Sequence, residues 1–138
     1  MRGYEEREDG RLVAITSTGH GYDSAMDSRF GRCAFFAMIG SDGVIEAVPN
    51  AARGLGNGAG IQAAKQIVDL GADTVITGDV GPNAFRVLAA AGVRVFVGAN
   101  GTVGEVLDGY RKGELREAAA STAPGHHGMR GGRWGNRQ

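Results

Sequence analysis

The chain has 138 residues, 42% of them hydrophobic, and its 15 basic and 15 acidic residues give a formal net charge of zero. This length and apolar fraction are typical of one domain with its own core, and the zero charge argues against attraction of the whole molecule to nucleic acid or a membrane surface. A single cysteine excludes an internal disulfide and any cage of several cysteines around zinc or iron–sulfur.

Glycine is the unusual residue, with 25 copies, and most of them stand in loops between patterned segments. Such loops are typical of backbone that approaches another group closely. Residues 1–10 are rich in charge and lack periodicity, so we expect a flexible N-terminus. No apolar run has the length of a membrane span and the start has no signal-peptide pattern, so we expect a cytoplasmic protein.

The first half of the domain is predicted to be strands. Apolar, β-rich runs predict three strands, at 12–18, 33–39 and 44–48. The pair Asp42-Gly43 joins the last two strands and indicates a hairpin. The intervening loop 19–32, "GHGYDSAMDSRFGR", is long for a compact domain, which is typical of a functional or mobile segment.

The second half alternates helices and strands. Helical spacing of apolar residues predicts helices at 61–71, 82–92 and 102–112, and short apolar runs predict strands at 74–77 and 94–98. Pro82 suits a first helical position, and Thr102 with Glu105 fits a capping box. The order β-β-β-α-β-α-β-α predicts an α/β domain over 11–116 with one mixed five-stranded sheet. Residues 117–138 are rich in Gly, His and Arg without a period, so we expect a disordered tail.

Ligands of such sheets bind outside the carboxyl ends of the parallel strands. Glycine-rich loops are expected to gather there, at 19–32, 53–60, 78–83 and 98–102. Three of them lead into helix N-termini, where unpaired N–H groups and the helix dipole favour anions. Together with Arg29 and Arg32 they would form a site for a multiply charged anion. The alternative is that these glycines only make turns.

Two residues of these loops are candidate metal ligands. Cys33 follows the two arginines, whose positive charge is expected to favour the thiolate, and His20 stands between two glycines. The alternatives are a buried structural cysteine and a solvated histidine. In the tail, His126 and His127 would bind copper or nickel only weakly.

Two enzyme-related interpretations are disfavoured. Gly54, Gly56 and Ala59 match a loose dinucleotide fingerprint, but they follow a hairpin strand and no acidic residue ends a strand some twenty residues later. A metal-dependent nuclease needs carboxylates on adjacent central strands, and the first strand, "LVAITST", has none.

Three segments resemble one known family: "DSRFGRCAFF", "GNGAGIQAAKQIVDLGADTVITGDVGPNAFRVLAAAGVRVFVG" and "VGEVLDGYRKGEL". They are similar to the dinitrogenase iron–molybdenum cofactor biosynthesis family, which includes NifX, NafY, the C-terminal domain of NifB and the orange protein, over about residues 11–116. The resemblance implies a ribonuclease H-like fold and a non-catalytic carrier of an anionic metal–sulfur cluster. Arg29 stands where nitrogenase-branch members often have histidine. An arginine at this position resembles the stand-alone, orange-protein-like branch.

The resemblance therefore predicts a carrier or storage protein for a cluster that contains molybdenum with copper or iron and is held without covalent bonds. Cluster contacts are expected from Arg29, Arg32, Asn57, Gly58, Gly60, Gly81 and Asn83, with His20 and Cys33 as metal ligands. The alternative is an interaction or regulatory module that binds no cluster tightly and acts with a partner such as a P-loop ATPase or a cofactor-assembly protein. Neither nucleic acid nor a membrane is expected as a partner.

Overall fold

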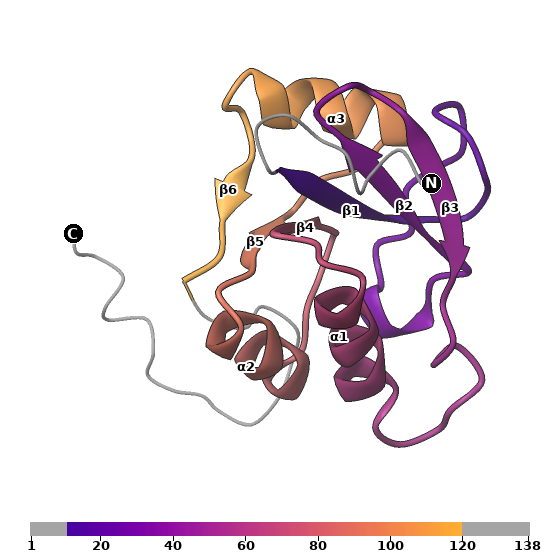
Figure 1. Cartoon of the computed structure of the whole chain (residues 1–138), viewed down its shortest axis with the longest axis vertical. Helices are drawn as coiled ribbons and strands as arrows, with labels where there is room; N and C mark the ends of the chain where they lie inside the picture. The colour runs from indigo at the N-terminus through magenta and orange to yellow at the C-terminus, as the bar shows by residue number, and fades with distance from the viewer. Residues whose placement is uncertain (1–10, 120–138) are drawn as a thin grey trace.

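The computed structural model describes residues 11–119, which form one mixed sheet with helices on both faces (Figure 1). Six strands lie side by side in the order β3-β2-β1-β4-β5-β6. Their bounds are β1 Leu12–Ser17, β2 Phe35–Gly40, β3 Ile45–Pro49, β4 Thr74–Ile76, β5 Arg94–Val97 and β6 Arg116–Glu117. The helices are α1 Ala59–Asp69, α2 Pro82–Ala90 and α3 Val103–Arg111, and a short 3-10 turn, η2, spans Phe30–Arg32.

Strand β1 joins an antiparallel half of the sheet to a parallel half. It pairs antiparallel with β2, which forms the predicted hairpin with β3, and it pairs parallel with β4, which is parallel to β5. Parallel neighbours need crossover connections, and the connections into β4 and β5 contain α1 and α2 respectively. The predicted α/β class and the mixed sheet are therefore confirmed.

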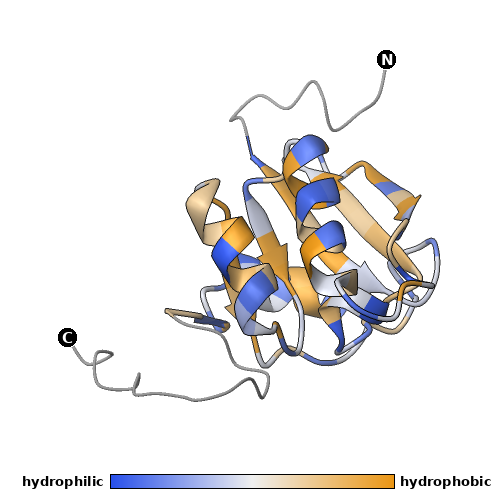
Figure 2. Ribbon diagram, turned by 90° about the horizontal axis from the view of Figure 1, so that it is seen from below, coloured by the Kyte–Doolittle hydropathy of each residue, from blue (hydrophilic) through white to orange (hydrophobic). Residues whose placement is uncertain are grey.

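Two hydrophobic cores lie on the two faces of the sheet. Side chains alternate along a strand, so Leu12 and Ala14 of β1 join the core under α1 and α2, while Val13 and Ile15 join the core under α3. Figure 2, seen from the side of α1 and α2, shows mainly apolar strands behind helices along which hydrophilic and hydrophobic residues alternate. Each fully buried aliphatic side chain contributes about 1.5–3 kcal/mol to the free energy of folding.

The helix ends follow the predicted signals. Thr102 and Glu105 form the capping box of α3, and Pro82 opens α2. Gly71 and Gly92, just beyond α1 and α2, have positive φ angles of 85° and 79°. These capping residues and glycines fix where each helix begins and ends, and therefore where the loops at the edge of the sheet begin.

The sheet has six strands rather than the predicted five. Strand β6 has only two residues, too few for any alternation to be read, and it pairs antiparallel with β5. Its Glu117 binds Arg94 through two hydrogen bonds of 2.8 and 3.1 Å, and the hydrogen bond from this guanidinium lowers the pKa of the Glu117 carboxyl. The folded domain thus continues past the predicted boundary at residue 116, and the Ala118 N–H donates to Val95 O.

Two predictions fall outside the described residues. They are the flexible N-terminus, 1–10, and the part of the predicted tail from residue 120 that contains His126 and His127. Within residues 11–119, no helix is long and apolar enough to cross a membrane.

Candidate functional site

A pocket of about 430 Å³ lies at the carboxyl ends of the parallel strands, between η2 and the starts of α1 and α2. We call it the loop pocket. All seven predicted cluster-binding residues line it: Arg29, Arg32, Asn57, Gly58, Gly60, Gly81 and Asn83. The sequence segments that contribute are far apart in the chain, and three close backbone contacts bring them together.

The first contact joins the arginine loop to the end of β4. The Asp79 N–H donates to Ser28 O at 2.8 Å, and Arg29 forms an isolated parallel bridge with Asp79. A Cβ atom at position 78 would lie 2.7 Å from Ser28 Cβ and 2.8 Å from Ser28 Cα and O. Only glycine permits this approach. Gly78 therefore fixes the position of the backbone from which the Arg29 side chain extends.

The second and third contacts join the arginine loop to α1 and α1 to α2. A Cβ atom at Gly31 would lie 3.1 Å from the N and Cα atoms of Gly60, in the first turn of α1. A Cβ atom at Gly60 would in turn lie 3.4 Å from Ala84 Cβ, in the first turn of α2. Small residues therefore allow the start of α1 to lie against η2 and the start of α2 to lie against the start of α1.

The helix starts at the loop pocket have no side-chain cap. The N-cap residues of α1 and α2 are Gly58 and Gly81, and neither makes a side-chain cap hydrogen bond. The first N–H groups of such helices and the positive end of the dipole favour a negative ligand. The prediction of three converging helix starts is wrong for α3, because Thr102 and Glu105 cap its N-terminus and it covers the other face of the sheet.

The two arginines of the pocket have different partners. The side chain of Arg29 is 66% exposed, and its Nε atom lies 3.3 Å from Asp27 Oδ1. Arg32 donates to two backbone carbonyls of the glycine-rich loop, Leu55 O at 2.8 Å and Gly56 O at 3.2 Å. Arg29 is thus the more available cation, while Arg32 also holds the loop that leads into α1.

Two carboxylates accompany the arginines, and the sequence analysis did not assign them to the site. Asp79 lines the pocket, and Asp27 accepts hydrogen bonds from the N–H and Nε of Arg29. Two arginines and two aspartates sum to no net charge. Binding of an anion here would therefore depend on the placement of charges and on the helix starts, not on an excess of cations. The position of Asp79 directly after a parallel strand was the signal available in the sequence.

Cys33 does not reach the loop pocket. Its side chain is fully buried, and its thiol lies 3.4 Å from Phe30 O, to which it donates. Burial, with a smaller contribution from the charge of Asp27, raises the pKa of the thiol to about 12. The prediction that Cys33 is a thiolate is therefore wrong. The arginine side chains lie on the surface, and desolvation of the buried sulfur is the largest influence on its pKa.

Asn50 is a further residue that the sequence analysis missed. It is buried, and its Nδ2 donates to Cys33 O at 3.0 Å and Gly31 O at 3.2 Å, while its Oδ1 accepts from Ala52 N at 3.0 Å. These hydrogen bonds tie η2 to the glycine-rich loop. An asparagine two residues after a predicted strand end gives no sequence signal that distinguishes this role from a turn.

His20 also lies outside the loop pocket lining. It is exposed, and its ring packs edge-on against Phe35 with the ring centroids 4.6 Å apart. Among residues 11–119, no group of three or more His, Cys, Asp or Glu side chains is placed to hold a metal ion. The part of the site that the structure describes consequently offers charges and N–H donors rather than a set of metal ligands.

These features define a class of small α/β proteins with a pocket between glycine-rich loops at the carboxyl ends of the parallel strands. Within that class, the chain belongs to the family described as dinitrogenase iron–molybdenum cofactor, whose sequence profile matches residues 11–113.

Similar proteins come from bacteria and archaea. The apo form of the orange protein from Desulfovibrio gigas is 36% identical, with a TM-score of 0.80 over 86% of this chain and all of that one. A Thermotoga protein provisionally named as NifB is 34% identical, with a TM-score of 0.69 over 83% of this chain and 99% of that one. An uncharacterized protein of Methanocaldococcus jannaschii is 26% identical over 69% of this chain and 84% of its own length.

Proposed function

We propose that the protein binds an anionic metal–sulfur cluster in the loop pocket and carries or stores it without catalysing a reaction. The observation that supports this most directly is the convergence of Arg29, Arg32 and two uncapped helix starts on one pocket. A sulfide-rich anion accepts hydrogen bonds from bare N–H groups and is attracted by guanidinium groups. Family membership, with the orange protein among the similar structures, supports the same kind of cargo.

The cargo we propose is a cluster of molybdenum with copper or iron, held non-covalently in a ribonuclease H-like domain located in the cytoplasm. Contacts come from Arg29 and from the backbone at Gly58, Gly60 and Gly81, with Arg32, Asn57 and Asn83 at the rim. We leave Cys33 and His20 out of the contact set, because neither lines the pocket.

A regulatory module that acts with a partner such as a P-loop ATPase is the second candidate. The charge balance of the loop pocket favours it, because Asp79 lines the pocket and Asp27 pairs with Arg29, and both oppose a multiply charged anion. The two candidates differ in one property: a protein of the second kind stays colourless when offered sulfide clusters.

The test is a titration of oxygen-free protein with tetrathiomolybdate, with and without Cu(I), followed by desalting, visible absorption and analysis of metals and sulfide. We expect coloured wild-type protein with a fixed ratio of molybdenum to protein. In the variant Arg29→Glu/Arg32→Glu the retained molybdenum is expected to be lost, because two attractive charges become repulsive. Both side chains are exposed, so the fold should be retained, which circular dichroism checks.

A matched control is Arg111→Glu/Lys112→Glu, which makes the same change of net charge at exposed positions at the end of α3. It should retain molybdenum as the wild type does. Equal loss in both double variants would mean that total charge, not the loop pocket, holds the anion. A wild-type protein that never retains colour would favour the regulatory module.

A further inference from the structure

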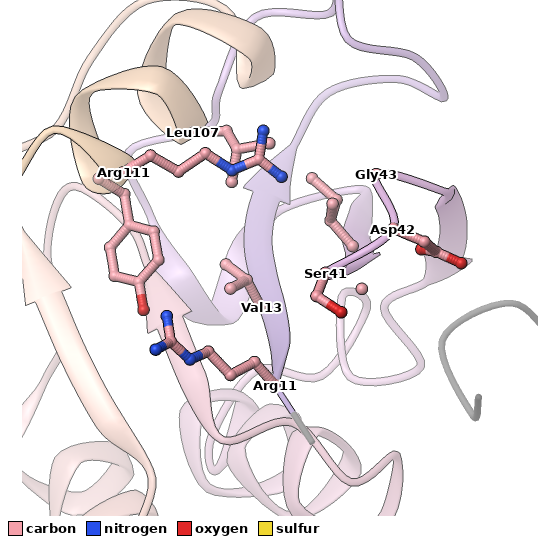
Figure 3. Close-up of a pocket in the computed structure, with 10 residues that line it drawn as sticks. Arg11, Val13, Ser41, Asp42, Gly43, Leu107 and Arg111 are labelled. Carbon is pink, nitrogen blue, oxygen red and sulfur yellow. The ribbon is translucent and has the colours of Figure 1, made fainter. Parts of the chain in front are cut away.

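A second pocket lies beside the start of β1, on the face of the sheet that α3 covers (Figure 3). Its volume is about 380 Å³, within the range of about 300–1,000 Å³ that is typical of small-molecule sites. The start of β1, the turn between β2 and β3, and the C-terminal part of α3 form it. We call it the α3 pocket. It shares no residue with the loop pocket, so binding in it does not depend on the proposed function.

The floor of the α3 pocket is apolar. Val13, Ile39 and Leu107 line it and belong to the buried core under α3. Tyr110 adds a half-buried aromatic ring, which packs edge-on against Phe96 with the ring centroids 5.1 Å apart. This contact fixes the ring, so a ligand that enters the pocket meets a preformed hydrocarbon surface.

Arginines stand at the mouth of the pocket. In Figure 3, Arg111 extends from α3 across β1 and Arg11 extends from the start of β1, with Val13 between them. Among residues 11–119, the Arg111 guanidinium makes no hydrogen bond or ion pair, whereas Lys112 pairs with Asp108 at 3.0 Å. A guanidinium with unused donors beside an apolar floor suits a planar carboxylate, which it binds through two parallel N–H groups.

One carboxylate, that of Asp42, also lines the pocket. The Asp42 carboxylate accepts a hydrogen bond from the Val44 N–H at 3.0 Å, and Figure 3 shows it turned away from both arginines. The last carbonyls of α3 accept hydrogen bonds from the N–H groups of Lys112, Gly113 and Glu114. Arg111 is therefore the charged side chain of the described lining whose guanidinium makes no hydrogen bond or ion pair within residues 11–119.

We propose that the α3 pocket binds a small organic acid with an aryl or branched alkyl body. The carboxylate lies against Arg111, and the apolar body lies on Val13, Ile39 and Leu107 beside the Tyr110 ring. Both halves of the ligand are needed: an inorganic anion lacks the surface that the floor binds, and a neutral hydrocarbon leaves the guanidinium without a partner.

The test is a titration of ¹⁵N-labelled full-length protein with 3-phenylpropionate, with amide chemical shifts as the readout. We expect saturable shifts at Gly40, Gly43 and Tyr110. The neutral analogue 3-phenylpropanamide should bind at least about tenfold more weakly, because a hydrogen bond to a charged group contributes about 1.5–3 kcal/mol. Arg111→Gln should weaken binding of the acid by a similar factor.

The matched control is Lys112→Gln, which removes the same charge one residue further along the chain, at a side chain paired with Asp108. Its affinity for 3-phenylpropionate should stay within about twofold of the wild type, because exposed charges are screened by solvent. The proposal is overturned by an absence of saturable shifts in the wild type, by shifts confined to Gly58 and Gly81 of the loop pocket, or by equal weakening in both variants. Unchanged affinity in Arg111→Gln also overturns it.

Discussion

The two pockets contain the same cation, arginine, in opposite surroundings. In the loop pocket the arginines stand among glycine backbone, uncapped helix starts and the Asp79 carboxylate. In the α3 pocket they stand over buried aliphatic side chains. Backbone N–H groups suit a compact inorganic anion with many acceptor atoms, whereas an aliphatic floor suits carbon. The difference teaches that the neighbours of an arginine, not the arginine itself, select the kind of anion.

Gly78→Ala should separate the two pockets most strongly. The added Cβ atom would lie 2.7–2.8 Å from atoms of Ser28, two of them backbone atoms, so the loop that carries Arg29 must move. We expect the free energy of unfolding to fall by about 1–3 kcal/mol and retention of tetrathiomolybdate to be lost. Binding of 3-phenylpropionate in the α3 pocket should be unchanged. Denaturant unfolding and the two titrations measure these effects.

The control for this variant is Gly21→Ala, at a position where a Cβ atom meets no other atom within 4 Å. It should behave as the wild type in all three measurements. Wild-type retention of molybdenum in Gly78→Ala would show that the approach of Gly78 to Ser28 does not set the geometry of the loop pocket.

Asp79→Asn should have a smaller effect, in the opposite direction. It removes one negative charge from the lining of the loop pocket, so the affinity for tetrathiomolybdate is expected to rise about three- to tenfold, which corresponds to the roughly 1 kcal/mol of one Coulomb interaction at 4 Å in water. Asp42→Asn, beside the α3 pocket, should leave this affinity unchanged. Equilibrium titration of both variants with tetrathiomolybdate measures these affinities. A weaker affinity in Asp79→Asn would mean that the carboxylate supports the site rather than opposing the anion.

Cys33→Ala should have the smallest effect on cargo, with the molybdenum content of the protein unchanged. The thiol does affect stability. Its pKa is raised by burial to about 12, so the buried neutral thiol favours the folded state below the ordinary thiol pKa of about 8.5, and this contribution is lost as the pH rises from there towards 12. Unfolding at about pH 8 and pH 10 should show the wild-type advantage over Cys33→Ala shrinking at the higher pH. Loss of molybdenum in Cys33→Ala would mean that Cys33 is a metal ligand after all.

Topology was the predictable part of the site. Strand and helix alternation places loops at the carboxyl ends of parallel strands, and for that reason the seven residues predicted from Arg29 to Asn83 all line one pocket. The rest depends on tertiary packing. The burial of Cys33 follows from how η2 folds over the core, and the partners of Arg32 lie more than twenty residues away. Strand β6 is too short for its residues to show a period.

The close approaches around the loop pocket also bear on when the site forms during folding. The hairpin of β2 and β3 joins neighbouring segments and closes a short loop, whereas β1 pairs with β4 across a long stretch of chain. Contacts between distant segments carry a larger closure entropy and form later. The walls of the loop pocket need Ser28 against Gly78 and Gly31 against Gly60, so we expect the pocket to stay incomplete in a nascent chain until α1 and β4 are in place.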